Sequence, residues 1–150
     1  MTSRSSHGFT LVELLLVMAI MAAVTTLFLT KVTTGTNSAE LRAATREMTA
    51  ALAETRSLAI AGNRVTAVVI AADARHYREP RREHLVPPRL AVAFSGVVPL
   101  AAGAGAIYFF PDGSSSGGEI DFAAGPASAA VHVDWFTGHA GAQDIRAARR

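Results

Sequence analysis

The chain contains no cysteine among its 150 residues. This absence excludes a disulfide, a thiolate metal site and a thiol nucleophile, although it says nothing about the cellular compartment. The aspartate, glutamate and histidine residues are also scattered, without an acid–base constellation. We therefore predict no enzymatic activity, no catalytic residues and no cofactor.

The chain also lacks a strong excess of one charge. Fourteen basic and 12 acidic residues give a formal net charge of +2, which does not define a nucleic-acid-binding protein. Half of the residues are apolar. Beyond an N-terminal segment, the length suffices for one small domain with a single core and is too short for two.

A long hydrophobic run near the N-terminus contains one charge. Phe9–Leu29 spans 21 residues, the length of a membrane-crossing helix, and its only charged residue is Glu13. A charge at the centre of such a helix costs about 2.5–3.5 kcal/mol, and less toward its ends. The pattern predicts a transmembrane helix in which Glu13 meets an opposite charge on a partner. The simpler alternative is a glutamate that reaches the aqueous interface.

An ordinary cleaved signal peptide fits this segment poorly. Its hydrophobic core would be shorter than 21 residues, an Ala-x-Ala site would follow, and Glu13 would not interrupt it. The distribution of basic residues on the two sides of the run does not choose an orientation.

The sequence from Gly8 to Leu14, GFTLVEL, resembles the class III signal of type IV pilins and type II secretion pseudopilins. This resemblance implies that a prepilin peptidase removes residues 1–8 by cutting between Gly8 and Phe9. The same enzyme would methylate the new amine of Phe9. Glu13, the fifth mature residue, would then pair with the Phe9 amine of a neighbouring subunit during filament assembly.

Residues 39–61 show the periodicity of an amphipathic helix, and Gly62-Asn63 is a typical stop. Together with residues 31–38, whose β-branched residues and glycine leave their helicity open, they form a predicted segment 31–62 after the helix of residues 9–30. The predicted core stripe contains Leu41, Ala44, Met48, Leu52, Thr55 and Ala59.

Residues 63–150 are predicted to form a β-rich domain. Strand patterns occur at 64–72, 90–95, 107–110, 119–122 and 131–135, which with the preceding helix indicates an α+β fold with an antiparallel sheet. The charged, proline-interrupted segment 73–89 is predicted to be an exposed, mobile loop.

Two C-terminal segments narrow the resemblance. Residues 108–118, YFFPDGSSSGG, and 133–138, VDWFTG, resemble the minor pseudopilin H and FimT-type pilin group. The resemblance implies a type IV pilin-like fold and a structural subunit of the periplasmic pseudopilus that helps export folded proteins. Other pseudopilins would be its partners. It would be a single-pass inner-membrane protein with its C-terminal domain in the periplasm.

Two alternatives concern its role. In one, the chain is a type IV minor pilin acting in pilus assembly or DNA uptake, with Arg146, Arg149 and Arg150 contacting phosphates. In the other, it is a membrane-anchored binding domain that never polymerises.

Two groups of residues offer candidate metal ligands, but neither predicts a metal site. Asp112, Ser114, Ser116, Glu119 and Asp121 supply oxygens for a calcium ion, but their spacing is not that of an EF-hand and favours a plain hairpin. The second group is His132, Asp134 and His139. The alternation of polar and apolar residues there indicates polar side chains that face solvent, and it favours this interpretation over a metal site.

Overall fold

A single long helix opens the structure, a computed structural model that describes the backbone of residues 11–147 and the side chains of residues 11–25 and 38–143. Helix α1 covers Leu11–Gly62. It runs through residues 31–38 without a break, because adding β-branched residues to a formed helix costs only tenths of a kcal/mol each. Asn63 then takes a left-handed φ of 44°, and the Arg64 amide donates to the Ala59 carbonyl at 3.2 Å, which ends the helix as predicted.

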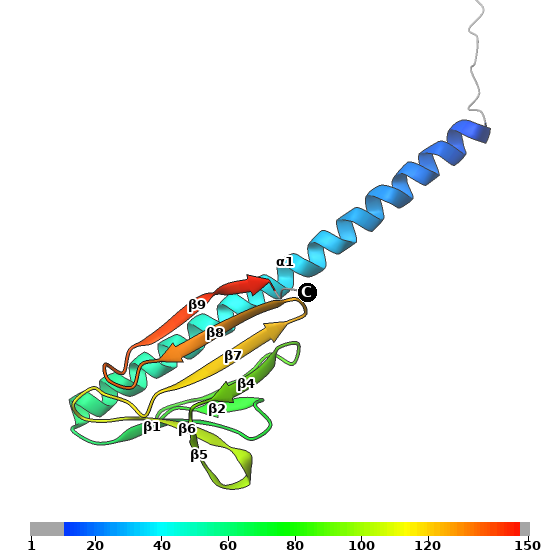
Figure 1. Cartoon of the computed structure of the whole chain (residues 1–150). Helices are drawn as coiled ribbons and strands as arrows, with labels where there is room; N and C mark the ends of the chain where they lie inside the picture. The colour runs from blue at the N-terminus through cyan, green and yellow to red at the C-terminus, as the bar shows by residue number, and fades with distance from the viewer. Residues whose placement is uncertain (1–10, 148–150) are drawn as a thin grey trace, which may run out of the picture. The chain divides into compact units, whose positions relative to one another are not determined.

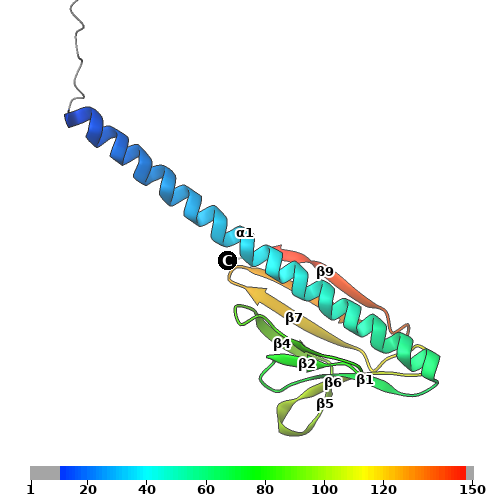
Figure 2. The same cartoon turned by 180° about the vertical axis from the view of Figure 1, so that it is seen from behind.

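Within the described residues, nine strands follow the helix and form two antiparallel sheets (Figures 1 and 2). The first has the order β3-β2-β1-β6-β5 and the second β4-β7-β8-β9. Their bounds are β1 Thr66–Ile70, β2 His76–Arg78, β3 Glu83–Leu85, β4 Ala91–Ser95, β5 Val98–Pro99, β6 Gly105–Phe109, β7 Gly118–Ala124, β8 Ala127–Val133 and β9 Ala140–Ala147, with a short 3-10 helix at Ala101–Gly103. The predicted α+β class is confirmed.

The five predicted strand patterns correspond to β1, β4, β6, β7 and β8, with shifted ends. One shift matters for the surface: Trp135 was predicted in a strand, but β8 ends at Val133 and Trp135 lies in the following turn. The prediction also missed β9, whose sequence AGAQDIRA has few β-branched residues.

The core is one cluster of apolar side chains from α1 and both sheets. All six residues of the predicted helix stripe are buried. The largest fully buried side chains beside them include Phe109 on β6 and Phe122 on β7. The hydroxyl of buried Thr55 donates to the Ala51 carbonyl at 2.7 Å, so its polar group is satisfied inside the core.

The prediction of a mobile loop at residues 73–89 is wrong. Strands β2 and β3 form a hairpin there, and β2 continues the first sheet by pairing with β1. Four side chains of the segment are buried, namely Tyr77, Glu79, His84 and Val86. The segment is therefore part of the folded domain despite its charge and its prolines.

Three glutamates of α1 contact the segment 73–89 from the helix side. Glu40, Glu47 and Glu54 recur every seven residues, so they lie along one face of the helix. Their partners are Arg89 at 3.9 Å, His84 at 2.7 Å and Arg81 at 3.5 Å, respectively. We call this set the glutamate ladder. The two arginine contacts are exposed and contribute little, so the buried contact of His84 is the main one.

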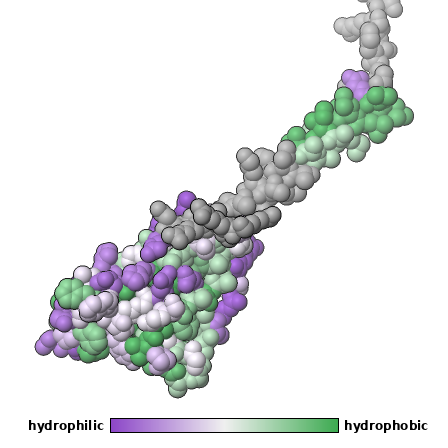
Figure 3. Space-filling model, in the orientation of Figure 1, coloured by the Kyte–Doolittle hydropathy of each residue, from purple (hydrophilic) through white to green (hydrophobic). Residues whose placement is uncertain are grey.

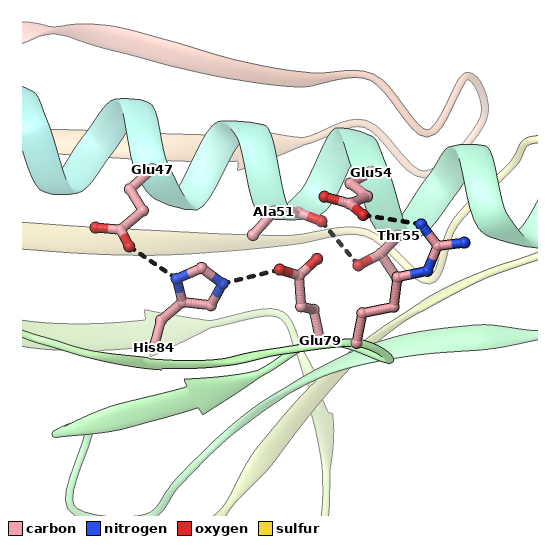
Figure 4. A network of polar contacts seen from close by, with 7 residues as sticks. Glu47, Ala51, Glu54, Thr55, Glu79 and His84 are labelled. Atoms are coloured by element: carbon pink, nitrogen blue, oxygen red, sulfur yellow. Dashed lines mark hydrogen bonds and ion pairs between the residues drawn. The ribbon is translucent and has the colours of Figure 1, made fainter.

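His84 lies between two carboxylates (Figure 4). Its Nδ1 is 2.7 Å from Glu47 Oε1, and its Nε2 is 2.8 Å from Glu79 Oε1. A neutral imidazole carries only one N–H, whereas an imidazolium donates from both nitrogens. With both carboxylates ionised, the geometry therefore requires a charged His84. Its ring stacks on Tyr77 with centroids 4.8 Å apart.

The electrostatics agree with this protonation state. Burial alone lowers the pKa of His84, but hydrogen bonds and charges from Glu79 and Glu47 outweigh it and leave the pKa raised. Burial, with the same two carboxylates, also raises the pKa of the Tyr77 hydroxyl, which therefore stays neutral. A histidine with a raised folded-state pKa stabilises fully below its unfolded value of about 6.5, and this stabilisation is lost as pH rises through the folded-state pKa.

We predict that His84→Phe, which keeps an aromatic ring on Tyr77 but removes both donors, destabilises the protein by about 3 kcal/mol because Glu79 is left buried without its partner. Thermal unfolding of the full-length protein in a nonionic detergent, followed by circular dichroism from pH 6 to pH 9, measures this.

The wild-type protein should lose stability as pH rises, and the difference from the variant should shrink. His132→Phe, at an exposed histidine of β8, is the matched control and should stay within about 0.5 kcal/mol. An equal stability difference at pH 6 and pH 9 would contradict a charged His84.

Candidate functional site

The first described part of α1 is apolar on all sides. Residues 11–25 are all exposed, and the large apolar side chains among them are Leu11, Val12, Leu14, Leu15, Leu16, Val17, Met18, Ile20, Met21 and Val24. Figure 3 shows a nearly continuous hydrophobic surface on this segment. A helix with apolar residues around its whole circumference needs a cover other than water, whether lipid or neighbouring helices.

Glu13 lies in the first turn of α1 and is exposed. A carboxylate in this position interacts favourably with the positive end of the helix dipole. The predicted cleavage residues, Gly8 and Phe9, lie outside the described residues. Across the described parts of the chain, no helix combines the length and apolar character needed to cross a membrane.

The turn considered for calcium uses its oxygens for its own folding. Asp112 Oδ1 accepts hydrogen bonds from the Ser114 amide at 2.9 Å and the Ser114 hydroxyl at 2.6 Å. The hydroxyl of Ser116 accepts from the Tyr108 amide at 3.0 Å. Glu119 and Asp121 lie along β7 in register with β4 and β8. The contacts are those of a hairpin.

The second metal candidate is a capped turn. Asp134 Oδ1 accepts hydrogen bonds from the amides of Phe136 at 3.1 Å and Thr137 at 2.7 Å, and from the Thr137 hydroxyl at 2.8 Å. His132 and His139 take no part in these bonds. Within the described residues, no group of three or more histidine, aspartate or glutamate side chains is arranged to hold a metal ion.

The two C-terminal motif segments, distant in sequence, meet at one surface. The turn before β7 and the turn between β8 and β9 come together beside Arg56 of α1. The Arg56 Nε donates to the Gly113 carbonyl at 2.9 Å. These elements line a groove of about 700 Å³, which we call the turn groove; its residues are Arg56, Phe110, Asp112, Gly113, Ser114, Ser115, Trp135, Phe136 and Thr137.

The sequence alone did not reveal this groove. The strand expected through Trp135 would have placed alternate side chains in the core, whereas Trp135 and Phe136 are 67% and 70% exposed. The available signal was Asp134 followed by Thr137-Gly138, a pattern typical of a capped turn. The arginine tail proposed for DNA gives no comparable geometry: the side chain of Arg146 and all of Arg149 and Arg150 lie outside the described residues.

Two regions of the chain match known protein families. Residues 3–29 match the prokaryotic N-terminal methylation motif, and residues 44–138 match the family described as Type II transport protein GspH. Type II secretion system protein H of Xanthomonas campestris pv. campestris is 35% identical over 146 residues, which cover 95% of this chain and 86% of that protein.

Two solved structures share the fold. The minor pseudopilin EpsH of the Vibrio cholerae type 2 secretion system has a TM-score of 0.54 and 12% identity, over 72% of this chain and 97% of that one. The type IV minor pilin FimU of Pseudomonas aeruginosa also has a TM-score of 0.54, with 14% identity, over 75% and 90% of the two chains. These likenesses confirm the pilin-like fold. By sequence, the chain belongs to the family of type II secretion system H proteins, the minor pseudopilins, and is a structural, non-enzymatic subunit that acts with other pseudopilins.

Proposed function

We propose that a prepilin peptidase removes residues 1–8 by cutting between Gly8 and Phe9 and then methylates the amine of Phe9. The match of residues 3–29 to the N-terminal methylation motif supports this assignment. The cut would leave a mature chain whose apolar segment begins at its first residue. The leader would thus keep the protein from entering a filament before processing.

The apolar segment from Phe9 to Leu29 holds the subunit in the inner membrane as a single pass, with residues 63–150 in the periplasm, until the subunit enters the pseudopilus. The observation that carries this proposal is the exposed surface of residues 11–25, which is apolar all round except for one carboxylate. Such a surface suits lipid first and the neighbouring helices of a filament afterwards.

Glu13 supplies the polar contact in that filament. A neighbouring subunit's Phe9 amine, positively charged after cleavage, is the partner that the motif provides. Desolvation offsets much of the attraction between two charges in an apolar environment, so the pair sets which subunits associate and in what register. The FimU likeness concerns the fold alone, and the 35% identity to a secretion protein favours secretion over a pilus or DNA-uptake role.

Replacing Gly8 by alanine should block maturation. The signal has glycine immediately before the cut, and alanine would put a side chain at that position. We expect the variant to retain residues 1–8 and an unmethylated N-terminus, measured by intact mass spectrometry of protein from cells that express the peptidase. Ser3→Ala in the leader is the control and should mature normally. Full maturation of the Gly8 variant would overturn the cleavage assignment.

Replacing Glu13 by alanine should leave cleavage and methylation intact but reduce incorporation into the pseudopilus. A charge-assisted hydrogen bond contributes about 1.5–3 kcal/mol, so the incorporated fraction should fall roughly tenfold or more. The measurement is the amount of subunit cross-linked to other pseudopilins, together with export of a secreted protein. Asp121→Asn, at an exposed carboxylate of β7, is the control. Wild-type incorporation of the Glu13 variant would disprove the assembly contact.

A further inference from the structure

The turn groove is a preformed surface at the end of the domain where α1 stops. Its floor joins three elements: Arg56 of α1 donates to the Gly113 carbonyl, and Gly138 of the β8–β9 turn packs onto the same carbonyl. Gly113 and Gly138 have φ values of 86° and 64°, and a Cβ on Gly138 would overlap the Gly113 carbonyl oxygen. The two turns are therefore held in fixed contact, and the groove exists before any ligand binds.

The walls of the groove are aromatic and exposed. Trp135 and Phe136 contact each other edge to face, with ring centroids 5.6 Å apart, and Phe110 adds a third ring at 37% exposure. Hydrogen bonds of Asp134 and Thr137 account for the shape of the turn, but the folded core uses neither exposed ring. Rigid exposed aromatic groups of this kind supply much of the binding energy in protein interfaces. Figure 3 shows hydrophobic surface among hydrophilic residues at this end of the domain.

The rim carries negative charge. Asp112 lines the groove, and Asp134 begins the turn that presents the two aromatic residues. Hydrogen bonds from Ser114 lower the pKa of Asp112, and hydrogen bonds from Thr137 lower that of Asp134, so both carboxylates stay ionised at neutral pH. The turn hydrogen bonds of both carboxylates are made by Oδ1, and each carboxylate has a second oxygen that can accept from a further donor.

Arg56 provides the opposite charge at the floor. Its Nε is committed to Gly113, and the guanidinium has four further N–H donors. Donors at the bottom of an apolar groove suit the carbonyl groups of an extended peptide backbone. A free anion at this position would have to pass the two carboxylates first, which disfavours it by like-charge repulsion.

We propose that the turn groove docks a basic and apolar segment of another protein chain. An arginine or lysine side chain of that segment stacks on Trp135 and pairs with Asp112, the adjacent apolar side chains contact Phe110 and Phe136, and the backbone carbonyl groups accept from Arg56. Cation–π contact and charge pairing then act on the same basic side chain, which gives the groove its selectivity. This interaction is independent of cleavage at Gly8 and of the contact of Glu13.

The chain contains a single tryptophan, so the emission of Trp135 reports on the groove directly. The test titrates full-length protein in a nonionic detergent with a short capped peptide of alternating leucine and arginine. Matched peptides carry glutamine or glutamate in place of arginine. We expect a saturable blue shift of Trp135 emission with the arginine peptide, and at least tenfold weaker binding of the other two.

Asp112→Asn keeps an acceptor for Ser114 and removes the charge. It should therefore weaken binding of the arginine peptide by about tenfold, while the melting temperature of the protein stays unchanged. Asp121→Asn is the matched control and should bind like the wild type. Equal binding of the glutamine peptide, preference for the glutamate peptide, or no loss in Asp112→Asn would overturn the proposal. So would a concentration-dependent shift without peptide, because a second copy of this chain would then fill the groove.

Discussion

Burial of one face of α1 is the constraint on which the rest of the domain depends. Leu41, Met48 and Leu52 lie on that face and are almost completely inaccessible to water. Side chains of the helix and of both sheets contribute to the same core cluster, so the helix completes a core that the two sheets share. The Glu47–His84 contact and the Arg56–Gly113 bond are made from positions next to that buried face, so both depend on how the helix is seated.

The first part of the same helix has a different distribution of apolar and polar residues. Residues 11–25 have no polar face, whereas residues 38–62 have a clear division between buried and exposed sides. The first part thus needs an apolar environment from outside the chain, and the second part finds one in its own sheets.

Local signals predicted a substantial share of this structure. The 3.6-residue stripe placed the core face of α1, and the alternation around Ile120 and Phe122 placed β7, because periodicity reports burial directly. The β2–β3 hairpin could not be found in this way. Its charged residues read as solvent-exposed, and the carboxylate that stabilises it on α1, Glu47, lies 37 residues before His84. The same holds for the turn groove, which exists only where two turns and a helix meet.

The glutamate ladder joins helix α1 to three residues of the segment 73–89. Seven helical residues make about two turns and rise about 10.5 Å, so successive glutamates lie on the same face of the helix. Glu47 contacts His84 of β3, and Glu54 contacts Arg81 between β2 and β3. Inserting or deleting one residue between two of these glutamates would rotate the later glutamate by about 100° around the helix axis. Its side chain would then point away from its partner. The lengths of α1 and of the segment that contacts it are thus linked, because these contacts depend on which face of the helix each glutamate occupies.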